Sequence, residues 1–446
     1  MIGGNITDIS QFDGMRLICQ YWHSVNSDKT VSAHFNVNLI NDSLVIVGDV
    51  HGDFNQFIAP LVLTELITIT SPEVKEIDNP GGVIYLPEYT INTNNKKRVI
   101  YLGDMVDEWI FSRSIVVMLY DILRQLPNNV KYIFGNHDLA LIGRYQLYTE
   151  KSINFALDTP ALWQTLKKEL NHVKNLKIYR TTAELDGEPF KGYDYIHSYV
   201  QPLFESLWKI FSQHLGVISC VIELNKKPFI VSHTTWSIQA IQQLMTPNNE
   251  YSIKSDRPGD NKDEQKQPFE TASNTVIEEM KYVKQLIDGV NIGKLEHENL
   301  ISEYQHLSTA INAIFRTKSK LYISKNLLTY TRITKNIFLN HIIGHSSGAE
   351  FRDQGVNVGL STYYEERESK LSPTFFNQRT VYYFDFGCSA GYDHDEISHP
   401  DFVYSNSSGL FVSNLPAFSF IINNGRDALL VLNDKTPRSG NKIVVD

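Results

Sequence analysis

KYIFGNHD, residues 131–138, is the stretch on which the predicted fold depends. It begins with an apolar run that is typical of a buried strand, and Gly135 lets the chain turn sharply where that run ends. Three polar side chains follow: the amide of Asn136 can bind a metal, the imidazole of His137 can transfer a proton, and Asp138 adds a carboxylate. Open α/β sheets carry their sites at the carboxyl ends of strands, so the stretch predicts a site at that edge.

Four other apolar runs end in a similar way. They cover residues 44–47, 99–102, 229–231 and 342–343. The side chains that follow them are carboxylates and imidazoles, namely Asp49, His51, Asp104, His233 and His345. Five predicted strands therefore bring metal-binding or proton-transferring groups to what we expect to be the same edge of a sheet.

The spacing of the first three runs predicts a βαβαβ unit with a parallel sheet, hence an α/β fold. Helical patterns cover residues 54–67 and 109–126, between the strands. Residues 71–97 interrupt the unit, and the turn signal Asn79-Pro80-Gly81-Gly82 predicts a surface hairpin there.

The ligand-bearing runs extend from Asp49 to His345, which favours one scaffold with long insertions. We expect an N-terminal segment, residues 1–43, and one domain, residues 44–446. The insertions are predicted at about residues 68–97, 139–227 and 246–330. The second is aromatic and largely helical, and the third begins with a polar loop.

Composition excludes several classes of protein. The chain has 446 residues, 42% of them hydrophobic, and a net charge of −9 without a block of like charge, so no nucleic-acid partner is expected. Three distant cysteines predict reduced thiols in a non-oxidising compartment. No apolar run approaches the ~20 residues of a membrane span, and residues 1–10 resemble no secretory signal. We therefore expect a cytoplasmic protein, and its oligomeric state stays open.

The ligand types point to two divalent cations. Two metals roughly 3.5–4 Å apart can hold both sides of a phosphoryl displacement, and they require a bridging carboxylate with histidine, aspartate and asparagine ligands. The spacing of Asp49 and His51 aims both at one ion, and Asp104 is well placed to bridge. Ligands for the second ion are Asn136, His233 and His345.

These motifs resemble the calcineurin-like metallophosphoesterases. Asp-x-His, Gly-Asp-x-Val-Asp, Gly-Asn-His-Asp, a histidine after a strand and Gly-His after a strand occur in that family's order. The resemblance implies a β-sandwich flanked by helices, with helical and loop insertions, and two bound divalent ions, manganese first and iron or zinc as alternatives. It also implies that Asp49, His51 and Asp104 bind the first ion, and that Asp104 bridges to the second.

The same resemblance implies catalytic roles. His137 corresponds to the acid that protonates the leaving oxygen, and Asp107 to the carboxylate that orients this histidine. Asp138 belongs to the catalytic set or holds the turn instead. Many relatives have a second histidine where this chain has Ser347. The absence of that histidine is similar to the phosphoprotein phosphatases and the diadenosine tetraphosphate hydrolases. Residues 135–141, GNHDLAL, look especially like the latter.

One position departs from both groups. Glu108 stands where they have an arginine that binds the phosphate, so another cation must serve. The candidates are Arg144 first, then Arg113 and Arg332.

We expect a phosphoesterase acting on phosphomonoesters, first of all a protein phosphatase, with a phosphorylated protein as its substrate. The alternatives are a hydrolase of dinucleoside polyphosphates and a non-catalytic scaffold, which only Glu108 favours. His197 and His341 are rivals of His233 and His345, although His341 fits a core histidine better. The acidic segment 393–399 is interpreted as a solvated loop.

Overall fold

The structure of the protein is a computed structural model. This structure describes residues 11–27, 39–79, 82–106, 111–139, 141–142, 184–185, 188–189, 193–236, 238–245, 274–287, 301–317, 339–347, 362–364, 380–385, 419–423, 427–431 and 442–443. Among the helices in them, none is long and apolar enough to cross a membrane.

The first sheet contains the predicted βαβαβ unit. Its strands run in the order β16-β15-β14-β1-β4-β5-β8. Their bounds are β1 Leu44–Val47, β4 Arg98–Tyr101, β5 Val130–Ile133, β8 Gly216–Val217, β14 Ser419–Asn423, β15 Asp427–Val431 and β16 Lys442–Ile443. Strands β1, β4, β5 and β8 are parallel, and β14 pairs with β1 antiparallel. The connecting helices are α3 (Phe54–Leu63) and α4 (Ser112–Gln125), each shorter than the sequence pattern predicts.

A second sheet carries the remaining ligand-bearing strands. Its order is β12-β13-β11-β10-β9. The bounds are β9 Ser219–Leu224, β10 Lys227–Ser232, β11 His341–Ser347, β12 Thr362–Tyr364 and β13 Thr380–Asp385. Strands β10, β11 and β13 are parallel, whereas β9 and β10 form an antiparallel hairpin. The expectation of a single sheet edge is therefore wrong, since the ligands follow strands of two sheets.

The two sheets pack face to face through alternating apolar side chains. Leu44 and Ile46 of β1 lie in one buried cluster with Val231 of β10 and Ile342 of β11. The alternate residues, such as Val45, face the other way and pack with the helices. This period-2 arrangement makes the molecule a sandwich flanked by helices, which confirms the predicted fold class.

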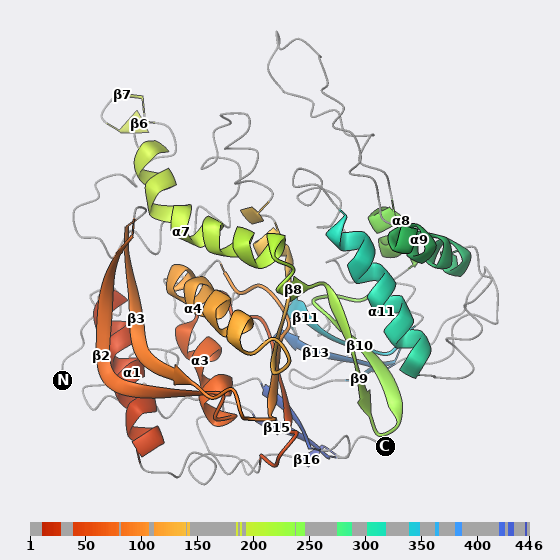
Figure 1. The fold of residues 1–446 in the computed structure, drawn as a ribbon, viewed down its shortest axis with the longest axis horizontal. Helices are drawn as coiled ribbons and strands as arrows, with labels where there is room; N and C mark the ends of the chain where they lie inside the picture. Colours follow the sequence, from red (N-terminus) through yellow and green to blue (C-terminus); the bar gives the residue numbers. More distant parts are fainter. Residues whose placement is uncertain are drawn as a thin grey trace.

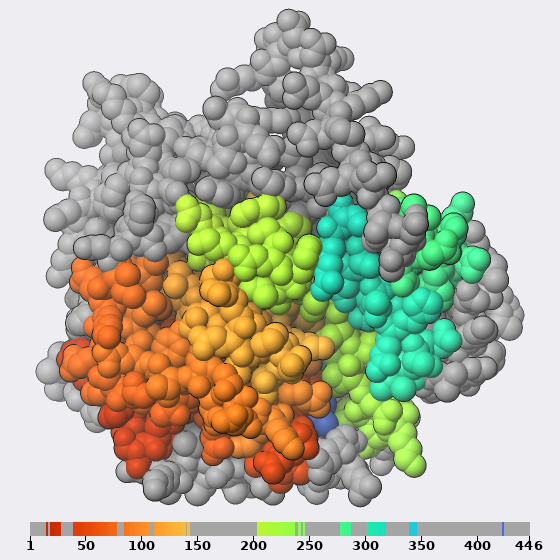
Figure 2. Space-filling model, in the orientation of Figure 1, coloured from red at the N-terminus to blue at the C-terminus, as the bar shows by residue number. Residues whose placement is uncertain are grey.

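Helices cover both outer faces of the sandwich (Figure 1). Helices α3, α4 and α7 (Tyr193–Ser212) lie over the first sheet. Helices α8 (Ile238–Met245), α9 (Asn274–Ile287) and α11 (Ile301–Arg316) lie over the second. The space-filling view shows α7 beside α11 (Figure 2), and the rings of Phe211 and Phe315 meet there with centroids 5.5 Å apart. The helices predicted at residues 54–67 and 109–126, and the predicted helical insertion at residues 139–227, therefore supply the layer over the first sheet. A short hairpin of β6 (Glu184–Leu185) and β7 (Glu188–Pro189) precedes α7.

The predicted surface hairpin is present, although it covers residues 67–91 and so begins and ends earlier than the predicted range. It consists of β2 (Ile67–Asn79) and β3 (Gly82–Ile91), paired antiparallel. Helix α1 (Gln11–Ser27) packs against β2 and α3. The fully buried Trp22 of α1 donates a hydrogen bond from Nε1 to Asn55 Oδ1 at 2.9 Å. Residues before position 44 thus contribute to the main hydrophobic core.

Candidate metal centre

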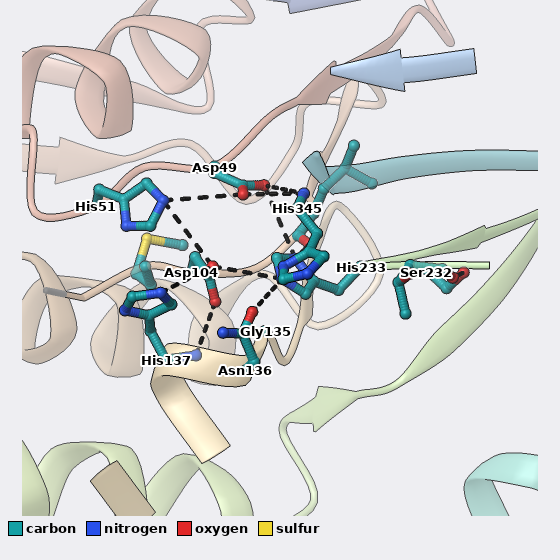
Figure 3. Close-up of polar contacts among 12 residues, drawn as sticks. Asp49, His51, Asp104, Gly135, Asn136, His137, Ser232, His233 and His345 are labelled. Carbon is teal, nitrogen blue, oxygen red and sulfur yellow. Dashed lines mark hydrogen bonds and ion pairs between the residues drawn. The ribbon is translucent and has the colours of Figure 1, made fainter. Parts of the chain in front are cut away.

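The carboxyl ends of five strands from the two sheets meet at one place (Figure 3). Asp49 and His51 follow β1, Asp104 follows β4, and the polar residues of the quoted stretch follow β5. His233 follows β10 of the second sheet. His345 lies in the last part of β11, where the register with β13 shifts between Ile343 and Ser347. The fold therefore brings all six predicted metal ligands together.

The backbone at the centre adopts conformations that are uncommon for residues with a side chain. The φ angles are 47° at His51, 43° at Asp104 and 64° at His345. Aspartate and histidine tolerate this left-handed region better than most residues. Strained backbone of this kind concentrates at functional sites, and here it occurs at three of the predicted ligands.

Two glycines let the ligand loops approach closely. A Cβ at Gly135 would overlap the Asp104 carboxylate, and one at Gly344 would overlap Oδ1 of Asp49. The glycines of the Gly-Asn-His-Asp and Gly-His motifs therefore have a steric purpose that the motifs alone do not reveal.

Asp104 lies at the centre of the group and is buried. Its Oδ2 lies 3.4 Å from His233 Nε2, 3.8 Å from His137 Nε2 and 3.9 Å from His51 Nε2. Its Oδ1 accepts a hydrogen bond from the backbone N of His137 at 2.9 Å. Burial by itself would raise the pKa of Asp104, but the nearby histidines, His233 foremost, hold it well below its usual value. Asp104 is therefore an anion shared by the surrounding imidazoles.

His233 shows that the donor set fits a cation. Its Nδ1 lies 2.8 Å from the carbonyl oxygen of Leu102, which can only accept, so Nδ1 carries the hydrogen. Its Nε2 then faces Asn136 Oδ1 at 2.9 Å and Asp104 Oδ2 at 3.4 Å. The lone pair of His233 Nε2, the amide oxygen of Asn136 and the carboxylate oxygen of Asp104 therefore face one another. These three electron-rich atoms repel unless a proton or a metal ion lies between them. Burial lowers the pKa of His233, but Asp104 outweighs it and raises the pKa overall. The geometry is thus suited to positive charge.

Asp49, His51 and His345 complete the arrangement. Asp49 Oδ2 lies 3.9 Å from His51 Nε2 and accepts a hydrogen bond from the backbone N of His345 at 2.9 Å. Burial, followed by the charge of His233, lowers the pKa of His345 to about 3. A neutral imidazole is the form that binds a metal.

The potential ligands divide into two groups that share Asp104. One contains His51, Asp104 and His137, and the other contains Asp104, His233 and His345. Within each group the ligand atoms lie within 4.8 Å of one another. The first group places His137, predicted to be an acid, where it could also act as a ligand.

Asp138 joins two loops of the centre. Its Oδ1 accepts a hydrogen bond from the backbone N of Met105 at 3.0 Å, and its Oδ2 accepts one from Gly135 N at 2.9 Å. Burial, and then the charge of Asp104, raises the pKa of Asp138 to about 6. These contacts fit the second predicted role, that of holding the turn.

The predicted phosphate-binding residues are placed only in part. Arg113 is buried at the start of α4. Its charge lowers the pKa of Tyr85 on β3, which burial and Glu76 raise more strongly. Arg113 therefore lies near the hairpin, and its contact with phosphate stays a prediction. Asp107, Glu108, Arg144, Arg332 and the segment 393–399 lie outside the described residues.

Three groups that hold the metal ligands in place were not predicted from the sequence. They are the Leu102 carbonyl that orients His233, the backbone N of His345 that binds Asp49, and the bonds of His341 described below. Backbone groups leave no trace in residue identity, so no sequence signal could have revealed the first two.

Comparison with solved structures gives weak likenesses. One is a cold-active protein-tyrosine phosphatase of a psychrophile, Shewanella sp., and another is a point mutant of a cold-active protein tyrosine phosphatase. Their TM-scores are 0.30 and 0.32, each at 12% identity, covering 90% of this chain and 80% of the other. Likenesses at this level carry no argument about function.

Among curated proteins, no sequence matches this chain significantly. A family model does match: it covers residues 43–253, which include strands β1, β4, β5 and β10 and every predicted metal ligand except His345. Residues 43–253 of this chain are thus matched by the family of calcineurin-like phosphoesterases.

Proposed function

We propose that this protein is a two-metal phosphoesterase whose centre is the cluster around Asp104. The observation that supports it best is the sharing of Asp104 by two ligand groups, one on each side. A carboxylate between two clusters of imidazoles is what a two-metal site requires. Asp49, His51 and Asp104 would hold one ion, and Asp104, Asn136, His233 and His345 the other. Divalent ions bound there supply an activated water near neutral pH and neutralise charge on the phosphate.

The proposed role of His137 is to protonate the leaving oxygen. Its side chain is 20% exposed, whereas those of His51 and His233 are 3% and 0% exposed. It can therefore reach a substrate that the other two cannot. The bond from its backbone N to Asp104 Oδ1 fixes its position relative to the ligands.

For the substrate, we propose a phosphorylated protein, because Asp107 stands where the phosphoprotein phosphatases have the carboxylate that orients the catalytic histidine. Ser347, in place of a second histidine, fits both this branch and the diadenosine tetraphosphate hydrolases. The stretch GNHDLAL favours the alternative, a dinucleoside polyphosphate. A non-catalytic scaffold is disfavoured by the complete set of converging ligands.

The test compares both substrate classes on one preparation. Metal-free protein is reconstituted with Mn²⁺, its metal content is counted by elemental analysis, and hydrolysis of phosphopeptides and dinucleoside polyphosphates is measured side by side. We expect close to two ions per chain and faster turnover of phosphopeptides. Asp104→Asn is the matched control, since it removes one charge and keeps the size of the side chain. Folded protein that binds no metal would overturn the proposal, and preference for the dinucleotide would overturn only the substrate assignment.

A further inference from the structure

A buried histidine outside the proposed ligand set connects two ligand-bearing strands. His341 is the first residue of β11 and has no exposed surface. Its Nε2 lies 2.9 Å from the backbone N of Trp236, and its Nδ1 lies 2.9 Å from the carbonyl oxygen of Leu339. Trp236 is three residues beyond His233, and His341 is four residues before His345.

The two partners determine the form of the His341 ring. A carbonyl oxygen can only accept a hydrogen bond, so Nδ1 carries the hydrogen and donates it to Leu339. A backbone N–H can only donate, so Nε2 is unprotonated and accepts from Trp236. Both nitrogens of a neutral imidazole are thereby used in holding backbone.

The bond to Trp236 closes one end of the turn that presents His233. The other end is held by the ladder between β10 and β11, in which Ser232 pairs with Ile343. Between these points Ser232 Oγ donates a hydrogen bond to the carbonyl oxygen of Thr234 at 2.5 Å. The turn from Ser232 to Trp236 is buried throughout, so β11 holds the His233 turn at both ends.

We propose that His341 is a positioning residue that fixes His233 relative to His345. This inference rests on the proposed function, in which both histidines bind the same ion. Without the acceptor at Nε2, the Trp236 end of the turn is released, and the approach of His233 Nε2 to Asn136 and Asp104 loses its support. The expected consequence is weaker binding of that ion.

Three variants separate this role from general stability. His341→Phe keeps a ring and removes the acceptor, whereas the Oε1 of Gln can take the place of Nε2 in His341→Gln. Tyr304→Phe is the matched control, because the buried Tyr304 hydroxyl accepts a hydrogen bond from the backbone N of Asn340 at 3.2 Å. That variant also removes an acceptor from a buried backbone N–H next to His341, but not from one in the His233 turn. If His341→Phe does not fold, His341→Asn replaces it, since its amide is too short to reach Trp236.

The measurement is calorimetric titration of each metal-free protein with Mn²⁺, together with its thermal unfolding without metal. We expect His341→Phe to bind one of two ions about tenfold more weakly, the lower end of what outer-shell changes cost. We expect His341→Gln to retain the affinity, and Tyr304→Phe to lose stability but not affinity. The inference is overturned if His341→Phe binds both ions as the wild type does, or if Tyr304→Phe weakens binding equally. Wild-type protein that binds no Mn²⁺ would overturn the proposed function, and the inference with it.

Discussion

Asp104 shows at the scale of one residue how the centre combines geometry and charge. Its backbone has a φ of 43°, which turns the chain directly after the glycine of the Gly-Asp motif. Its Oδ1 is bound by the backbone of His137, which leaves Oδ2 facing three imidazoles. Neighbouring positive charge favours the ionised form of a carboxyl group, so Asp104 stays anionic despite its burial.

Exchange of Asp104 for asparagine should therefore disturb both ions. We expect Asp104→Asn to retain neither ion at stoichiometric metal, and Asp49→Asn to retain about one, because only Asp104 belongs to both ligand groups. Elemental analysis after gel filtration measures this directly. Equal losses in the two variants would remove Asp104 from the bridging position.

His137 should be separable from the ligands by its kinetics. We expect His137→Ala to keep both ions and to lose about two to four orders of magnitude in turnover of a phosphopeptide, whose leaving group needs a proton. An aryl phosphate, which leaves readily, should lose much less. Loss of an ion in this variant would instead assign His137 to the ligand group with His51 and Asp104.

The loops after β4 and β5 form one unit at the scale of structural elements. Asp138 uses a different carboxylate oxygen for each of them, binding Met105 N through Oδ1 and Gly135 N through Oδ2. Asp53, the N-cap of α3, differs because its Oδ1 alone accepts from both Asn55 N and Gln56 N. Burial raises the pKa of Asp53 to about 6, and burial together with the charge of Asp104 raises that of Asp138 to about 6.

This difference predicts that exchange for asparagine lowers the free energy of unfolding more at Asp138 than at Asp53. At pH 8, Asp138→Asn leaves one buried N–H without an acceptor, which should cost about 1–3 kcal/mol of unfolding free energy. Asp53→Asn keeps both bonds, and asparagine caps helices about as well as aspartate. Both variants remove a buried charge, so that effect cancels in the comparison. Urea denaturation of metal-free protein gives the two values, and equal stability of the variants would mean that Asp138 does not connect the loops.

At the scale of the whole molecule, the centre joins two sheets. Asp49 follows β1 of the first sheet and binds the backbone of His345 in the second, 296 residues away in sequence. His233, which follows β10 of the second sheet, donates to the carbonyl oxygen of Leu102, which follows β4 of the first and lies 131 residues away in sequence. Cations bound between them would stabilise the sandwich itself, because ligand groups that are far apart in the unfolded chain are brought together only by folding.

Removal of metal should therefore lower stability. With Mn²⁺ at a hundredfold excess over its dissociation constant, one bound ion adds about 2.7 kcal/mol to the unfolding free energy. We expect the thermal unfolding midpoint to fall when a chelator is added and to recover with excess Mn²⁺. Asp104→Asn serves as the control and should show no such response. A wild-type midpoint that is independent of metal would contradict a centre held between the two sheets.

Local features of the sequence determined the strands, the hairpins and the side chains that follow each strand. Apolar runs, turn glycines and the order of motifs depend on a few neighbouring residues, so they could be recognised without coordinates. For the same reason the βαβαβ unit, the hairpin of β2 and β3 and the six convergent ligands were all anticipated.

Only the tertiary structure decided how the strands are shared between sheets and what holds each ligand in place. A strand pairs through backbone groups that are the same in every residue, so its partner is chosen by packing over long separations. The five ligand-bearing runs therefore look alike in sequence, although β10 and β11 lie in the second sheet. His341 shows the same limit, because its role depends on a backbone N–H of Trp236, 105 residues earlier in the chain, that packing alone brings to its ring.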